Sequence, residues 1–177
     1  MRHEDKKITT MRKETKQRLL LMTFILSLAL VWGQSCISKV ESQTASDTLV
    51  DIIKPLEEIK PDEVQTVEYE YYNHLVRKGA HVAEFSIIGV ELALLIIVFS
   101  KKKLDTFIVF INSVMAGMMI GLIDETIQIF SNRGTQVSDV WFDVLGAGLG
   151  ASVISIVYAV KRMKLGLTDE KNIDNRR

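Results

Sequence analysis

The sequence predicts an all-α membrane protein, built as a bundle of four membrane-spanning helices. Two observations support this fold class. The apolar residues of the 177-residue chain are collected in four long blocks with charged segments between them, as is typical of membrane spans. Three clusters of Lys and Arg are placed so that one side of a membrane receives all of them. The single cysteine, Cys36, rules out an internal disulfide framework.

The first span is predicted over residues 19–37, after a basic arm. Residues 1–18 hold seven Lys and Arg and are expected to form a disordered cytoplasmic arm. Residues 19–37 carry no charge and are about long enough to cross a hydrocarbon core of roughly 30 Å. A cleaved signal peptide would share these features, but no clean small-x-small cleavage site follows, and three more spans do. We therefore expect an uncleaved span. Lipidation of Cys36 is not expected, because Gly33 stands where a leucine-like residue would be needed.

A polar segment, residues 38–77, separates the first two spans and contains both prolines. Residues 64–75 have helical spacing of their apolar side chains, with Asp62 as an N-cap after Pro61. This extracytoplasmic helical segment is expected to lie on the membrane surface, to cover the outer ends of the spans, or simply to extend the second span outward.

Three further spans complete the predicted membrane domain, residues 19–160. They cover about residues 80–100, 105–130 and 140–160, and basic residues follow the second and the fourth span. The third is long enough to tilt or to project beyond the hydrocarbon. Residues 161–177 form a polar basic tail that is expected in the cytoplasm.

The distribution of Lys and Arg predicts the orientation of the chain, because positive residues concentrate on the cytoplasmic side of membrane proteins. The basic arm, the loop at residues 101–103 and the tail hold sixteen of the 22 Lys and Arg. The other six lie in the polar segment up to Lys78 and in a hairpin at residues 131–139. Both termini are therefore predicted in the cytoplasm, and the polar segment and the hairpin outside.

Under this topology, polar side chains from three spans meet in the outer leaflet. They belong to the start of the second span, the end of the third and the start of the fourth: Arg77, Lys78, His81 and Glu84; Asp124, Glu125 and Gln128; Asp139 and Asp143. Arg133 lies in the hairpin that joins the last two spans. Ionisable side chains in a membrane are costly and usually face protein or water, where they carry out a function. These residues therefore form the predicted functional site.

Glycines share helical faces with the acids on the last two spans. The two stripes are Gly117, Gly121, Asp124 and Gln128 on the third span, and Asp139, Asp143, Gly146 and Gly150 on the fourth. Each stripe contains a G-x-x-x-G pattern, which lets helix backbones approach closely. If these four glycines pack against neighbouring helices, the acids beside them are turned toward the interior of the bundle.

Two blocks of the sequence together resemble the VanZ-like family of bacterial membrane proteins. The blocks are RKGAHVAEF at 77–85 and DETIQIFSNRGTQVSDVWFDVLGAGLG at 124–150, and the resemblance covers about residues 70–160. Every polar element of the family pattern is present, with Asp143 in a place often held by asparagine. The resemblance implies a multi-pass protein of the bacterial cell membrane. The family's namesake accompanies glycopeptide-resistance genes and is associated with lowered sensitivity to teicoplanin, whereas the family offers no agreed catalytic residues.

Three functions and one structural interpretation fit this site. An envelope enzyme would bind Mg²⁺, Ca²⁺ or Mn²⁺ through the acids and His81, and clamp a phosphate or carboxylate of a lipid-linked wall precursor through its arginines. A binding or accessory protein would recognise a lipid or cell-wall component without changing it. A small transporter would use Glu91 near mid-membrane, although a hydrogen bond to Asn112 or Ser113 is the preferred role of Glu91. In the structural interpretation, the charges only neutralise one another and fix the helices in register.

Each candidate residue is assigned a role within this site. The catalytic candidates are His81, Glu84, Asp124, Glu125 and Asp139; the ligand-binding candidates are Arg77, Lys78, Gln128, Arg133 and Asp143; the candidate metal ligands are Glu84, Asp124 and Asp139. The expected partners are membrane lipids and a lipid-linked or cell-wall ligand at the outer leaflet. A homo-oligomer is compatible with a chain of this size, and no nucleic acid is expected.

Overall fold

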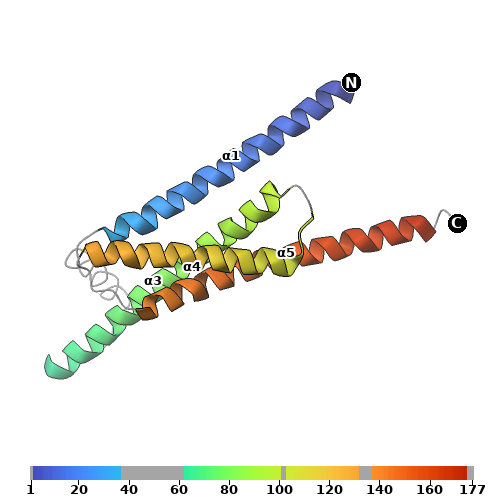
Figure 1. Cartoon of the computed structure of the whole chain (residues 1–177). Coiled ribbons are helices and arrows are strands. Elements are labelled where there is room, and N and C mark those ends of the chain that lie inside the picture. The colour runs from blue at the N-terminus through green and yellow to red at the C-terminus, as the bar shows by residue number, and fades with distance from the viewer. Residues whose placement is uncertain (1, 37–61, 101–102, 132–136, 175–177) are drawn as a thin grey trace.

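The computed structural model describes residues 2–36, 62–100, 103–131 and 137–174, and these residues form four long helices (Figure 1). The helices are α1 (Arg2–Ser35), α3 (Asp62–Phe99), α4 (Thr106–Phe130) and α5 (Val137–Asp174). Each contains a stretch long and apolar enough to cross a membrane: Lys13–Ser35, His74–Phe99, Thr106–Phe130 and Val137–Lys164. The predicted all-α, four-span fold class is confirmed.

The helices are longer than the spans predicted from the sequence. α1 begins at Arg2, so the basic arm that was expected to be disordered is instead the start of a helix. α3 is continuous from Asp62, so the helix predicted before the second span extends that span. Neither extension contains Pro, and Gly79, directly before the predicted second span, is the only Gly in them. Both are rich in good helix formers such as Lys, Glu and Gln. The rest of the polar segment, residues 38–61, lies outside the described residues.

α5 packs against two of the other helices. Its largest interface is with α3 and its second largest with α4, whereas α1 makes smaller contacts with α3 and α4. Both termini lie at one end of the bundle, together with the end of α3 and the start of α4 (Figure 1). The end of α4 and the start of α5 lie at the opposite end, which we call the α4–α5 end.

Glycines bring α3 and α5 into backbone contact. A Cβ atom added at Gly150 would overlap the backbone oxygen of Ser86, and one at Gly146 would lie 2.5 Å from the backbone oxygen of Val82. A third glycine, Gly89 on α3, faces the backbone of Ala147 in the same way, although the sequence patterns did not single it out. The two helices can therefore approach this closely only because these positions carry no side chain.

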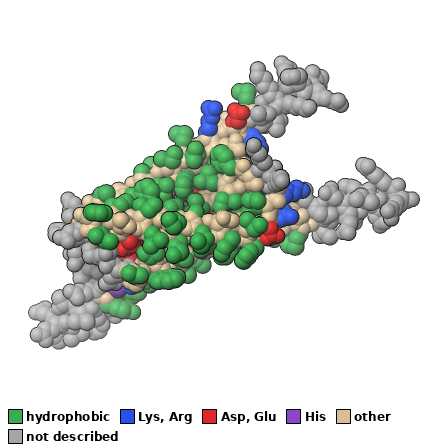
Figure 2. All heavy atoms as spheres, in the orientation of Figure 1, with side chains coloured by type: hydrophobic (Ala, Val, Ile, Leu, Met, Phe, Trp, Pro, Cys, Tyr) green, Lys and Arg blue, Asp and Glu red, His purple; other side chains and the backbone are tan. Residues whose placement is uncertain are grey.

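The outer surface of the bundle is apolar over its middle part. Figure 2 shows hydrophobic side chains covering this zone, with Lys and Arg gathered toward the end that carries the termini. Large apolar side chains such as Met115, Met119 and Leu122 on α4 are exposed there. An apolar zone of this extent is expected where a protein faces lipid. α1 joins the bundle through an interior cluster that includes Val31, Phe85 and Ile88.

Candidate functional site

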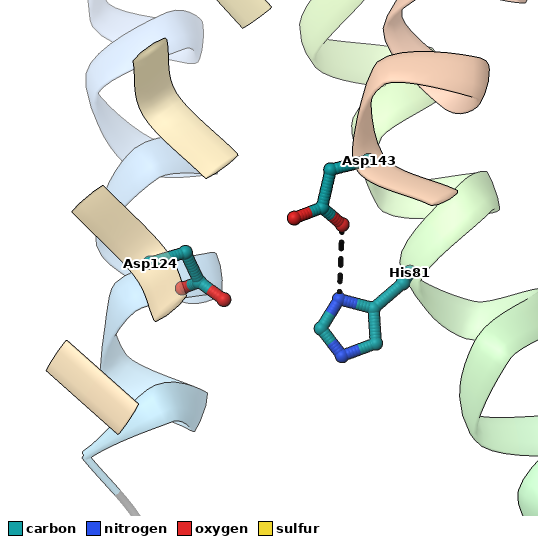
Figure 3. Close-up of side chains that lie close together, drawn as sticks. All are labelled: His81, Asp124 and Asp143. Carbon is teal, nitrogen blue, oxygen red and sulfur yellow. Dashed lines mark hydrogen bonds and ion pairs between the residues drawn. The ribbon is translucent and has the colours of Figure 1, made fainter. Parts of the chain in front are cut away.

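Three spans each contribute one side chain to a cluster near the α4–α5 end. His81 comes from α3, Asp124 from α4 and Asp143 from α5, and one possible ligand atom from each lies within 4.8 Å of the other two. Figure 3 shows the two carboxylates and the imidazole ring turned toward one another. The His81 Nδ1 and Asp143 Oδ1 atoms are 3.2 Å apart and form a hydrogen bond or an ion pair, depending on the protonation of the ring. Both aspartates are fully buried.

Uncharged donors hold Asp124 in place. The Ser35 hydroxyl donates to its Oδ1 atom at 2.6 Å, and the Gln128 side-chain amide donates to Oδ2 at 2.8 Å. The hydroxyl of Ser131, which caps the end of α4, donates in turn to the Ser35 backbone oxygen at 2.8 Å. These contacts fasten the end of α1 to the end of α4 and orient the Asp124 carboxylate without neutralising its charge.

A separate ion pair lies one helical turn from the cluster. Arg77 Nη2 lies 3.4 Å from Asp139 Oδ2, and Asp139 is almost fully buried. The neighbouring Lys78 directs its ammonium group over the Phe142 ring, 4.5 Å from the centroid, which is a cation–π distance. The two cations that begin the second span are therefore both engaged by α5.

Several carboxylate oxygens have no hydrogen-bond partner within the described part of the chain. Near the cluster they are Oδ2 of Asp143 and both oxygens of Glu125, and a fourth, Oε2 of Glu91, lies further along α3. Glu125 is only 7% exposed, so little water reaches it. Burying an ionised carboxylate without a partner typically costs several kcal/mol. The site therefore carries more negative charge than the described cations beside it neutralise.

Glu84 belongs to a neighbouring groove rather than to the three-residue cluster. The groove lies between α1 and α3 and is lined by Ser27, Leu30, Val31, Gln34, Glu84 and Ile87. Gln34 is a hydrogen-bond partner of the Glu84 carboxylate. The groove is thus mainly apolar, and its Glu84 lies one helical turn from His81 of the cluster.

Glu91 finds its partner on α1, not on α4. The Ser27 hydroxyl donates to Glu91 Oε1 at 3.1 Å. Asn112 and Ser113, the partners expected for Glu91, instead donate to the backbone oxygens of Ile108 and Val109 in their own helix. The expectation was wrong because periodicity places Glu91 on a face of α3 but does not tell which helix covers that face.

The structure divides the sequence-predicted residues into distinct groups. His81, Asp124 and Asp143 form the cluster, Gln128 supports it, Arg77 pairs with Asp139, and Glu84 lines the groove. The candidate metal ligands were Glu84, Asp124 and Asp139, and of these only Asp124 belongs to the cluster. The other two members of the cluster are His81 and Asp143. Arg133 lies outside the described residues. Ser35 was not predicted; its position at the C-terminal end of the first span, level with the acids, is the sequence signal that could have identified it.

The fold and the cluster define a class, namely a four-span membrane protein with buried carboxylates and a histidine at one end of its bundle. Within that class the chain belongs to the VanZ/LLP1 family, whose model matches residues 19–158. Neither a curated protein nor a solved structure matches the chain.

Proposed function

We propose that this protein acts in the bacterial cell membrane by binding a polar component of the cell envelope at the outer leaflet. The observation that carries the proposal is the excess of buried carboxylates at the α4–α5 end. Asp124, Asp143 and Glu125 are buried there, and His81 is the only described side chain paired with any of them that can carry a positive charge. Apolar side chains of similar volume would pack a bundle at lower cost, so these acids are best explained by a ligand that meets them.

The groove between α1 and α3 favours a ligand that is tethered to lipid. Its apolar lining, including Leu30 and Ile87, suits a hydrocarbon chain, and Glu84 and Gln34 add polar groups beside it. α1 makes smaller interfaces than the other helices, so it is the helix most easily displaced to admit such a chain. A lipid-linked wall precursor has this combination of a hydrocarbon tail and a polar head group.

The proposed orientation can be tested with the single native cysteine. Cys36 is exposed at the end of α1, next to Ser35 of the site. We expect a membrane-impermeant maleimide to label Cys36 in intact cells, because the distribution of Lys and Arg places this end outside. The matched control is a Cys36→Ser, Lys103→Cys chain, which should react only after permeabilisation. The reverse pattern would place the site in the cytoplasmic leaflet.

The binding role can be tested in a deletion strain complemented with single variants. In the deletion strain, Asp143→Asn should fail to restore the wild-type teicoplanin sensitivity. The purified Asp143→Asn protein should also carry less bound lipid-linked precursor than the purified wild type. Gly148→Ala serves as the control, because a Cβ atom there meets nothing within 4 Å. Full complementation by Asp143→Asn would remove the proposed role of the cluster.

An enzyme acting on the same ligand is the second candidate, and the observation that favours it is the His81–Asp143 pair. A carboxylate bonded to one imidazole nitrogen orients the ring and leaves the other nitrogen for proton transfer. An enzyme predicts that the deletion strain accumulates one precursor. A binding protein predicts an unchanged precursor pool with altered drug sensitivity.

A further inference from the structure

We propose that His81, Asp124 and Asp143 bind one divalent transition-metal cation, with Zn²⁺ as its best fit. The inference rests on the proposed function, since it names what meets the excess negative charge of the ligand site. Three different helices supply the donors, and their ligand atoms already lie within 4.8 Å of one another. Bond lengths of about 2.0–2.2 Å in a tetrahedral zinc site place the donor atoms roughly 3.4 Å apart. Small side-chain rotations would therefore bring the three atoms to ligand geometry.

The unpartnered oxygen of Asp143 points to a missing cation. Asp143 is fully buried, and its Oδ1 atom contacts His81, but its Oδ2 atom has no hydrogen-bond partner in the described part of the chain. Buried polar atoms normally have one. This oxygen lies on the side of Gly121, whose added Cβ would be 2.9 Å from it. Glycine at that position leaves room for the carboxylate to turn.

The net charge of the three side chains also favours a divalent cation. Asp124 and Asp143 together bring two negative charges, and even a protonated His81 would neutralise only one of them. Arg77 is occupied by Asp139 at 3.4 Å. A divalent cation bound to neutral imidazole and two carboxylates gives a site of zero net charge, which is the form a low-dielectric environment favours.

The contacts around Asp124 are those of a supported metal ligand. Ser35 and Gln128 each donate to one of its oxygens, and each oxygen keeps a lone pair that can face a metal. Hydrogen bonds of this kind orient metal ligands and are typically worth 10- to 100-fold in metal affinity. They also tie metal binding to the packing of α1, because Ser35 belongs to α1 and Asp124 to α4.

The donor set selects among metals. One imidazole nitrogen and two carboxylate oxygens suit Zn²⁺, and also Mn²⁺ or Fe²⁺, better than Mg²⁺ and Ca²⁺, which prefer oxygen alone. The sequence alone suggested Mg²⁺, Ca²⁺ or Mn²⁺, bound by acids from two helices together with His81. Three protein ligands also leave a coordination position open, as in catalytic zinc sites. A phosphate or carboxylate oxygen of the envelope ligand would fit that position.

Metal binding can be measured on the full chain in detergent after treatment with a chelator. We expect one equivalent of Zn²⁺ by calorimetry and elemental analysis, and a visible spectrum of low-symmetry Co²⁺ in the cobalt-loaded protein. His81→Ala and Asp143→Asn should weaken binding at least about 100-fold, and Ser35→Ala about 10-fold. Glu91→Gln is the control, because this buried acid is bonded to Ser27 away from the cluster, and it should leave the affinity unchanged.

Two results would overturn the proposal, and the first needs no variant. One is the absence of stoichiometric Zn²⁺ or Mn²⁺ in the folded wild-type protein. The other is equal affinity in wild type and in those cluster variants that elute as folded protein. Failure of the envelope role is a distinct outcome: the purified protein would bind the metal while Asp143→Asn still complements the deletion strain.

Discussion

Replacing Gly150 by alanine is expected to lower the free energy of unfolding by about 3 kcal/mol, which is the upper range for forcing an extra carbon into a packed interior. The added methyl group would overlap the backbone oxygen of Ser86 and lie 2.9 Å from the backbone nitrogen of Val90. Neither atom can rotate away as a side chain can, so α3 and α5 must separate. Because this interface positions His81 against Asp143, the cluster should be disturbed as well.

A matched control lies two residues away on the same helix. Gly148 is also helical, but a Cβ atom there meets nothing within 4 Å. Gly148→Ala should therefore leave the stability unchanged or raise it by up to about 1 kcal/mol, because alanine is the better helix former. Equilibrium unfolding in mixed detergent micelles can compare the two variants with wild type. Equal stabilities for both variants would mean that α3 and α5 are not in backbone contact at Gly150.

Hydrophobic blocks and glycine patterns were sufficient to predict the four helices and their buried faces. The third span illustrates why. Ser113, Gly117, Gly121, Asp124 and Gln128 recur at intervals of three or four residues, and all are buried in α4. A helix has a fixed periodicity, so such a stripe identifies one face from the sequence alone. The length of α1 was not foreseen, and for α3 the extension was only one of three alternatives, because polar residues with high helix propensity extend a helix without adding to its apolar pattern.

The pairing of residues between helices could not be predicted in the same way. His81 and Glu84 are three residues apart and therefore share one face of α3, but α5 meets His81 whereas α1 provides the partner of Glu84. Glu91 shows the same limit, since its partner Ser27 is 64 residues away in the chain. Such contacts depend on the rotation of each helix and on which neighbours cover it. Those quantities follow from the packing of the whole bundle.

A structural ion pair and a ligand site should respond differently when one charge is removed, and the stabilities of two variants can show the difference. Arg77→Gln should lower the free energy of unfolding by about 3 kcal/mol, because it leaves the buried Asp139 without its cation. We take the low end of the usual range because the Arg77 side chain remains 28% exposed. The double variant Arg77→Gln, Asp139→Asn should recover most of that loss, since no unpaired charge remains.

Asp143→Asn should behave in the opposite way in the metal-free protein. Asparagine has the same shape, and its oxygen can accept from His81 Nδ1 as Asp143 Oδ1 does at 3.2 Å. The substitution removes one of two buried carboxylates that share a single imidazole, so repulsion falls while the contact survives. We therefore expect an unchanged or higher melting temperature. Wild type, but not Asp143→Asn, should gain about 2.7 kcal/mol when Zn²⁺ is present at 100 times its Kd. A loss of about 3 kcal/mol in Asp143→Asn, with no response of wild type to metal, would show that these charges are balanced among themselves and that the cluster serves the fold rather than a ligand.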